Sequence, residues 1–229
     1  DKIEKLINNY YKKTKIILEL FDQSTFEYVI KFKNKVDIKI SCSEADNVDF
    51  VLKILKNFKK VFLNFSGYNL NEINKLLNKY KKFKSKLVIL YGFQGYPCEF
   101  YDLRLSLFDK FKKEGYQFGY SDHTLFKNYS ELKVATSIAI SKGAQFIEKH
   151  VCLNQKLEPP DYITALEFKK LENYILYSKK LFQELNSKKI RMSNAEKKYH
   201  DNMRKFLNTN GLKKEDKYLR LVKSQKKRI

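Results

Sequence analysis

Short apolar runs recur along the 229-residue chain, and longer stretches with apolar residues on one helical face separate them. An apolar run bounded by turn residues is typical of a buried strand, whereas apolar residues at i, i+3 and i+4 indicate an amphipathic helix. The pattern predicts six strands, at residues 16–18, 36–40, 61–65, 87–91, 117–120 and 145–147.

Capping boxes are predicted to start several of the intervening helices. In a capping box an N-cap side chain accepts a backbone N–H, and an acid three residues later bonds back. The spacing occurs at Ser24 and Glu27, Asn69 and Glu72, Asn128 and Glu131, and Thr164 and Glu167. The helix near Glu131 is predicted to end at Gly143, because glycine readily adopts the left-handed conformation that closes a helix.

Strands that alternate with helices predict an α/β fold with a parallel sheet and right-handed crossovers. A doubly wound sheet and a barrel both satisfy this order. The length of each unit matches a (β/α)8 TIM barrel, although six units leave such a barrel two strands short. No GxGxxG or GxxxxGK[ST] motif occurs, which disfavours a nucleotide-binding fold. The order and spacing of the elements therefore leave both architectures open.

Positive charge dominates the composition, with 47 Lys and Arg against 26 Asp and Glu and a formal net charge of +21. Such an excess indicates either nucleic-acid binding or a compositional bias. The charge is spread along the chain and no nucleic-acid-binding signature accompanies it, so the sequence favours the bias. The one dense basic stretch, 213–228, is predicted to be a solvated tail.

The remaining composition bears on the compartment. No run of 18 apolar residues occurs, so no membrane span is predicted. Cys42, Cys98 and Cys152 are odd in number and widely spaced, which supports neither a disulfide framework nor a thiolate zinc site. No secretory signal is visible, and we expect a reducing, cytoplasmic setting.

Histidines are scarce, and two of the three fall at the ends of adjacent predicted strands. His123 and His150 are separated by one strand-helix unit, and neighbouring strands lie about 5 Å apart. Two imidazoles at adjacent strand ends can bind one divalent ion, or they can be unrelated polar residues at the barrel mouth. His200 lies among charged residues and is expected at the surface.

Two charged residues near the second predicted strand are further candidates. Lys39 alternates with Ile38 and Ile40 and therefore faces either solvent or a barrel lumen. An ammonium group in the lumen needs an anion, which a bound phosphate would supply. Glu44 follows within reach of the same mouth, or it is an acidic residue at a helix start near Asn47.

Several short motifs, in order and spacing, resemble those of the sialic acid synthases and the related legionaminate and pseudaminate synthases. GYSDHT at 119–124 resembles the family's G-[YL]-S-D-H-T, and IEKH at 147–150 resembles its I-E-[KR]-H. KISCSE at 39–44, YP at 96–97 and PD at 160–161 are similar to three other family motifs. The resemblance covers about residues 15–190.

The resemblance implies an α/β fold that is an incomplete (β/α)8 TIM barrel, made of about six C-terminal βα units. It also implies an enzyme that condenses phosphoenolpyruvate with an N-acetylated hexosamine, giving a nonulosonic acid and phosphate. It implies that His123 and His150 bind Mn²⁺ or Mg²⁺, and that Lys39 and Ser121 bind phosphoenolpyruvate. Substrate contacts are also implied for Gln94, Tyr96 and Asp161, and catalytic roles for Glu44 and His150.

Three positions depart from the family pattern on the phosphoenolpyruvate side. Glu19 stands where the family usually has Thr, Cys42 replaces Ser, and Gln94 replaces Asn. A carboxylate at position 19 would repel an anionic substrate. The family's first two strands are expected to be missing, which would leave an open sheet edge and an exposed apolar lumen.

The resemblance also divides the chain. It implies a partial synthase domain at 1–188, a linker at 189–204, and at 205–229 either a basic tail or the remnant of a C-terminal antifreeze-like (SAF) domain. A homodimer is implied as well, because a partner subunit caps the site in the family. The alternatives are a catalytically impaired homologue that binds sugar or phosphate, and a basic nucleic-acid-binding domain.

Overall fold

The computed structural model describes residues 1–95, 98–187 and 191–207. The chain divides into two units, residues 1–185 and 186–229. The first unit contains eight strands within the described residues: β1 Ile16–Leu20, β2 Val36–Ile40, β3 Val61–Asn64, β4 Leu87–Tyr91, β5 Gln117–Asp122, β6 Phe146–Lys149, β7 Val151–Cys152 and β8 Leu166–Glu167. Its α-helices are α1 Lys2–Tyr10, α2 Phe26–Val29, α3 Val48–Asn57, α4 Leu70–Tyr80, α5 Leu107–Lys113, α6 Tyr129–Lys142 and α7 Phe168–Leu185.

The first six strands form one sheet in the order β1-β2-β3-β4-β5-β6, and every neighbouring pair is parallel. This order confirms the predicted parallel sheet of consecutive neighbours. Among the described residues, β1 and β6 each have a sheet neighbour on one side only, as expected of an incomplete barrel. β7 and β8 form a separate two-stranded parallel pair.

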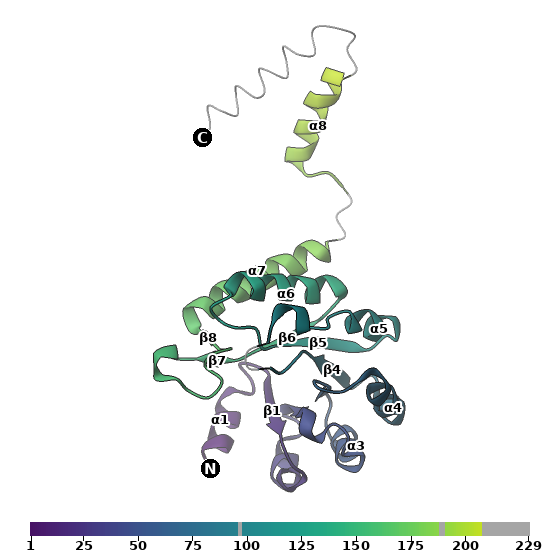
Figure 1. Ribbon diagram of the computed structural model, residues 1–229, viewed down its shortest axis with the longest axis vertical. Helices are drawn as coiled ribbons and strands as arrows, with labels where there is room; N and C mark the ends of the chain where they lie inside the picture. Colours follow the sequence, from purple (N-terminus) through teal and green to yellow (C-terminus); the bar gives the residue numbers. More distant parts are fainter. Residues whose placement is uncertain (96–97, 188–190, 208–229) are drawn as a thin grey trace. The chain divides into compact units, whose positions relative to one another are not determined.

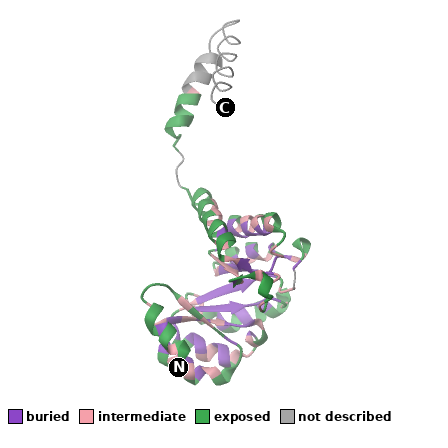
Figure 2. Ribbon diagram, turned by 90° about the vertical axis from the view of Figure 1, so that its left-hand side faces the viewer, coloured by how far each residue is buried: buried purple, intermediate pink, exposed green. Residues whose placement is uncertain are grey.

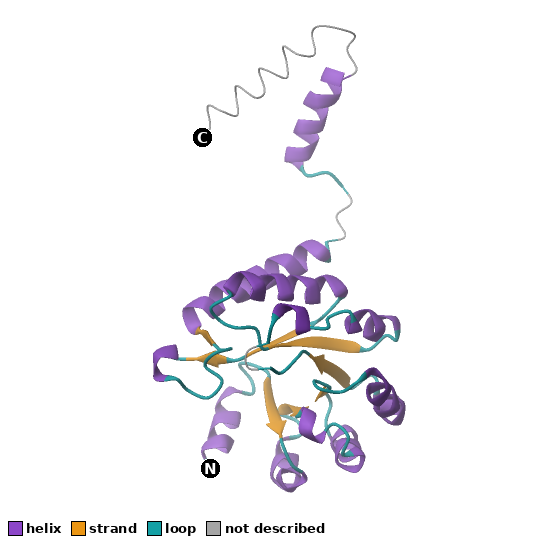
Figure 3. Cartoon of the chain, viewed as in Figure 1, coloured by secondary structure: helices purple, strands orange, loops and turns teal. Residues whose placement is uncertain are grey.

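The sheet is strongly curled, and helices lie around its outer side (Figures 1 and 3). Lys39 on β2 and Glu148 on β6 form an ion pair of 3.0 Å across the inner side. Four strand spacings in a flat sheet would separate β2 from β6 by about 19 Å. The curl therefore produces a concave inner face, as in part of a barrel.

Side-chain alternation divides the apolar residues between the two faces of the sheet. Ile38 and Ile40 are fully buried in the main core together with residues of the helices, and Figure 2 shows buried strands beneath partly exposed helices. The inner face carries a smaller cluster: Phe62, Val88 and Leu90, with Phe146 packed against them. Ile17, which lines the inner cavity from β1, is 45% exposed, which confirms that the lumen is partly open.

The helix-start predictions hold for one of the four capping boxes. Asn69 and Glu72 make both bonds of the box at the start of α4. Asn128 is the N-cap of α6 without a side-chain cap bond, and its amide nitrogen donates to the Glu131 carboxylate. The end of α6 at Gly143 is confirmed, with a φ of 107°.

The other two predicted boxes are wrong because nearby polar groups compete for the same bonds. Asp22 accepts the Thr25 N–H and starts a short 3-10 helix in place of the box at Ser24. The Thr164 hydroxyl donates to the Asp161 carbonyl, while Glu167 belongs to β8 and α7 starts one residue later.

The second unit contains one described helix, α8 Asn194–Leu207, which occupies most of the predicted linker and carries His200. The predicted cap or tail at 205–229 lies almost wholly outside the described residues and stays a prediction. Within the described ranges, no helix combines the length and apolarity needed to cross a bilayer.

Candidate functional site

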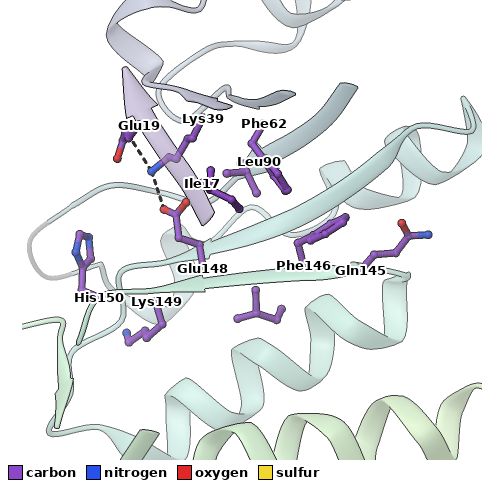
Figure 4. A pocket seen from close by; sticks show the side chains of 11 residues that line it. Ile17, Glu19, Lys39, Phe62, Leu90, Gln145, Phe146, Glu148, Lys149 and His150 are labelled. Atoms are coloured by element: carbon purple, nitrogen blue, oxygen red, sulfur yellow. Dashed lines mark hydrogen bonds and ion pairs between the residues drawn. The ribbon is translucent and has the colours of Figure 1, made fainter. Parts of the chain in front are cut away.

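A cavity of about 610 Å³ opens on the inner face of the curled sheet. Apolar side chains of β1, β3, β4 and β6 form part of its wall, and charged side chains from the carboxyl ends of β1, β2 and β6 complete it (Figure 4). The lining residues are Ile17, Glu19, Lys39, Phe62, Leu90, Gln145, Phe146, Ile147, Glu148, Lys149 and His150.

The Lys39 ammonium group lies inside this cavity between two carboxylates. Its Nζ is 3.0 Å from Glu19 Oε1 and 3.0 Å from Glu148 Oε1. Glu148 Oε1 also accepts the Ser121 hydroxyl at 2.7 Å. Lys39 and Ser121, both predicted to bind phosphoenolpyruvate, therefore meet at one carboxylate oxygen.

The Lys39 side chain is 12% exposed, so the lumen-facing orientation is confirmed and the solvent-facing alternative is wrong. Burial has the largest single effect on the Lys39 pKa and lowers it. Glu148 and Glu19 together outweigh burial and raise the Lys39 pKa above its ordinary value. Lys39 is therefore a charged ammonium group at neutral pH.

The two histidines at the adjacent strand ends face each other. His123 Nε2 and His150 Nε2 are 3.2 Å apart, which confirms the predicted proximity. His123 is 2% exposed, and the His150 side chain is 33% exposed at the cavity. Burial, together with the neighbouring His150, lowers the pKa of His123 to about 4, so this imidazole is neutral at pH 7.

Asp161 also reaches the histidine pair. Its Oδ2 lies 3.6 Å from His150 Nδ1, on the side of the ring away from His123. The Asp161 backbone is left-handed, with a φ of 62°, a conformation that aspartate tolerates better than most residues. A carboxylate at Nδ1 favours the tautomer whose proton lies on Nδ1, in which Nε2 is an acceptor.

A buried ion pair supports the two strands that carry this cluster. Asp122 and Lys149 are register partners on β5 and β6, and Lys149 Nζ lies 3.4 Å from Asp122 Oδ2. Their side chains are 0% and 3% exposed, and Figure 4 shows Lys149 directed away from Glu148. Asp122 Oδ1 accepts the N–H and hydroxyl of Thr124. The ion pair therefore holds the carboxyl ends of β5 and β6 together, on the side of the sheet away from Glu148 (Figure 4).

Gly92 allows the close approach of the β4 end to Ser121. A Cβ at position 92 would lie 2.0 Å from the Ser121 carbonyl oxygen, far inside van der Waals contact. The absence of a side chain at this position therefore helps to place Ser121 beside Glu148.

Two further predicted residues, Glu44 and Gln94, are not part of this cluster. Glu44 accepts the Asn47 amide at 2.9 Å and does not line the cavity, so its catalytic role stays a prediction. Gln94 Oε1 accepts the Cys42 thiol at 3.0 Å, which joins two positions that depart from the family pattern. Tyr96 lies outside the described residues.

Sequence reasoning missed Glu148, which touches both Lys39 and Ser121. The signal was its position two residues before His150, since alternate strand residues share a face. Identification of its partners required the curl of the sheet, which periodicity does not give.

The histidine pair fits a divalent metal as a two-nitrogen site. One ring is neutral at pH 7, and the two Nε2 atoms are close enough to share an ion with bonds of about 2.0–2.2 Å. No group of three or more His, Cys, Asp or Glu in the described part of the chain is arranged to hold a metal. A metal at the histidine pair would thus keep positions for water or substrate.

Comparison with known proteins supports the same family. N,N'-diacetyllegionaminic acid synthase of Campylobacter jejuni is 29% identical over 194 residues, covering 82% of this chain and 55% of that protein. The chain thus spans about half the length of the curated relatives it matches.

Solved structures agree on the fold. A spore coat polysaccharide biosynthesis protein E from Chromobacterium violaceum has a TM-score of 0.73 at 19% identity, covering 88% of this chain and 59% of that one. N-acetylneuraminic acid synthetase of Leptospira borgpetersenii has a TM-score of 0.65 at 17% identity, covering 87% of this chain and 84% of that one. The model of the NeuB family matches residues 3–190. The chain therefore belongs to the NeuB family, as the motifs at its strand ends predicted.

Proposed function

We propose that this protein is a nonulosonic acid synthase, which condenses phosphoenolpyruvate with an N-acetylated hexosamine and releases phosphate. One observation carries the proposal. The histidine pair, with Nε2 atoms 3.2 Å apart, lies at the same strand ends as the Lys39–Glu148–Ser121 cluster. The sialic, legionaminic and pseudaminic acid synthases among its relatives support this reaction class.

Lys39 and Ser121 bind the anionic groups of phosphoenolpyruvate in this proposal. Lys39 supplies a charge in a partly buried cavity, where the low dielectric strengthens an ion pair. Ser121 adds a neutral donor without further charge. The enol carbon attacks the sugar aldehyde and forms the C–C bond, water adds to the resulting cation, and phosphate leaves by C–O cleavage.

His123 and His150 would hold Mn²⁺ or Mg²⁺. When bound, this ion supplies Lewis-acid polarisation of the aldehyde oxygen of the open-chain sugar. Asp161, 3.6 Å from Nδ1, orients the His150 ring and would also contact the sugar. Glu44, Gln94 and Tyr96 contribute to substrate binding or to positioning the attacking water, and a homodimer completes the site.

An assay of phosphate release tests the proposal. The purified protein is incubated with phosphoenolpyruvate, an N-acetylated hexosamine and Mn²⁺, and the keto-acid product is identified by mass spectrometry. His123→Ala should abolish turnover, whereas His200→Ala on α8 should leave it unchanged. Absence of phosphate release with every N-acetylated hexosamine precursor tried, or full activity of His123→Ala, contradicts the proposal.

A second candidate function is a catalytically impaired homologue that still binds sugar or phosphate. The observation that favours it is the ion pair of 3.0 Å between Glu19 and Lys39. Glu19 stands at a position where the family usually has Thr. The same assay separates the two, since this candidate predicts ligand binding without phosphate release.

A further inference from the structure

The Glu19 side chain lines the cavity next to Lys39. Register pairing places Glu19 on β1 directly beside Lys39 on β2. Figure 4 shows the Glu19 side chain turned towards Lys39. The Glu19 Oε1 and Lys39 Nζ atoms are 3.0 Å apart. This contact is made from the strand at the edge of the described sheet.

The charges around Lys39 do not favour an anion. Glu19 and Glu148 contribute two negative charges against the single positive charge of Lys39, so the ionised cluster has a net charge of −1. Lys149 adds no free charge to the cavity, because it is paired with Asp122 behind the sheet. An incoming anion therefore meets a cation that is already compensated, in a site where charge interactions are strengthened by burial.

We propose that Glu19 is a competing counter-ion that sets the anion affinity of this cavity and must leave Lys39 before an anionic substrate binds. The proposal rests on the proposed function in taking Lys39 as the group that receives phosphoenolpyruvate. It identifies Glu19 as the residue that distinguishes this site from one with Thr at the same place.

Glu19 is the carboxylate that can leave Lys39 most readily. Its side chain is 33% exposed, and Lys39 is its one ion-pair partner among the described residues. Glu148 is held by Lys39 and also by the Ser121 hydroxyl at 2.7 Å. Rotation of Glu19 into solvent breaks one contact, whereas displacement of Glu148 breaks two.

Anion binding by charge-neutral variants tests the proposal. Titration calorimetry without added metal measures the affinities for inorganic phosphate and phosphoenolpyruvate in the wild type and in Glu19→Gln. We expect Glu19→Gln to bind both anions at least about tenfold more tightly, because a charge-assisted contact to Lys39 is released. Glu19→Thr should show the same direction and checks that the gain does not depend on one replacement.

Two controls localise the effect. Glu27 pairs with Lys53 at 3.1 Å on the exposed surface, so Glu27→Gln removes the same charge from an ion pair elsewhere and should leave anion affinity unchanged. Lys39→Met added to Glu19→Gln should cancel the gain.

Equal or weaker anion binding by both Glu19 variants overturns the inference, as does an equal gain in Glu27→Gln. These results are distinguishable from failure of the proposed function. A gain that depends on Lys39 but occurs without consumption of phosphoenolpyruvate sustains the inference and contradicts the synthase activity. Turnover by the wild type without tighter anion binding in the Glu19 variants sustains the synthase activity and overturns the inference.

Discussion

At the scale of single residues, Lys39 joins three strands through its two carboxylate partners. Lys39→Met should raise the KM for phosphoenolpyruvate by about tenfold to a hundredfold, as expected for loss of a charge-assisted contact. The KM for the sugar should change little, because Lys39 is assigned to the anionic substrate. Steady-state kinetics with each substrate varied in turn provides the measurement, and an equal loss for both substrates would indicate a folding defect instead.

The reactivity of the Cys98 thiol at pH 8 tests its burial at the residue scale. Burial raises the pKa of the Cys98 thiol to about 12, so the folded protein keeps it protonated at pH 8. Alkylation by iodoacetamide at pH 8 should therefore be much slower at Cys98 than at the more exposed Cys42, and should equalise after denaturation. Mass spectrometry of the labelled peptides gives the rates, and rapid labelling of Cys98 in the native protein would show that this environment is wrong.

The sequence predicted the meeting of His123 with His150, because it follows from strand order. Strand period left Lys39 facing either solvent or the lumen, and the family resemblance was what pointed to the lumen. The sequence indicated no further contact in the lumen. It did not predict that Glu148 reaches Lys39 from β6. That contact depends on how tightly the sheet curls, a tertiary property that a period of two does not encode. Repulsion of the substrate by Glu19 was expected, but its ion pair with Lys39 was not, because the sequence did not give the register of β1 against β2.

At the scale of elements, the β5–β6 pair depends on the buried Asp122–Lys149 ion pair. Lys149→Met should lower the free energy of unfolding by about 3–5 kcal/mol, because it leaves the Asp122 carboxylate buried without its partner. The double variant Asp122→Asn with Lys149→Met should lose less, since neither charge remains. Urea denaturation measures both.

The comparison variant for this pair is Lys142→Met, which breaks the Lys142–Asp109 pair, whose carboxylate side chain is 63% exposed. Exposed ion pairs contribute about 0–1 kcal/mol, so this change should be small. Equal effects of Lys142→Met and Lys149→Met would contradict a supporting role for the buried pair.

The junction of β4 and β5 is tested through Gly92. Gly92→Ala should lower stability by more than Gly67→Ala, because its Cβ would lie 2.0 Å from the Ser121 carbonyl. Gly67 has open space but a φ of 86°, so its replacement adds only the left-handed strain of about 1–2 kcal/mol. Urea denaturation of both variants gives the order, and the reverse order would show that β4 and β5 are not packed as described.

Element types were more predictable than helix starts. All six strands of the main sheet were predicted. The apolar runs are continuous in β3 and β4, which are buried along their whole length. Capping boxes failed at Ser24 and Thr164, where Asp22 and the Asp161 carbonyl make the competing local bonds. Such competition depends on the conformation of the loop. The sequence distance between the two members of a capping box does not determine that conformation.

At the scale of the whole molecule, the curl of the six-stranded sheet converts separate strand ends into one site. Two interpretations of the +21 net charge were open from the sequence, nucleic-acid binding and compositional bias. Membership of the NeuB family favours the compositional bias. The central claim is that the histidine pair binds one metal ion beside the Lys39 cluster.

Titration of the purified protein with Mn²⁺, followed by electron paramagnetic resonance of the free ion, tests this claim most directly. The account predicts one Mn²⁺ site, weakened at least about a hundredfold in His123→Ala and in His150→Ala, since even outer-shell partners of a metal contribute about ten- to a hundredfold. His200→Ala should retain the wild-type affinity. Absence of Mn²⁺ binding, or wild-type affinity in His123→Ala and His150→Ala, would contradict the account.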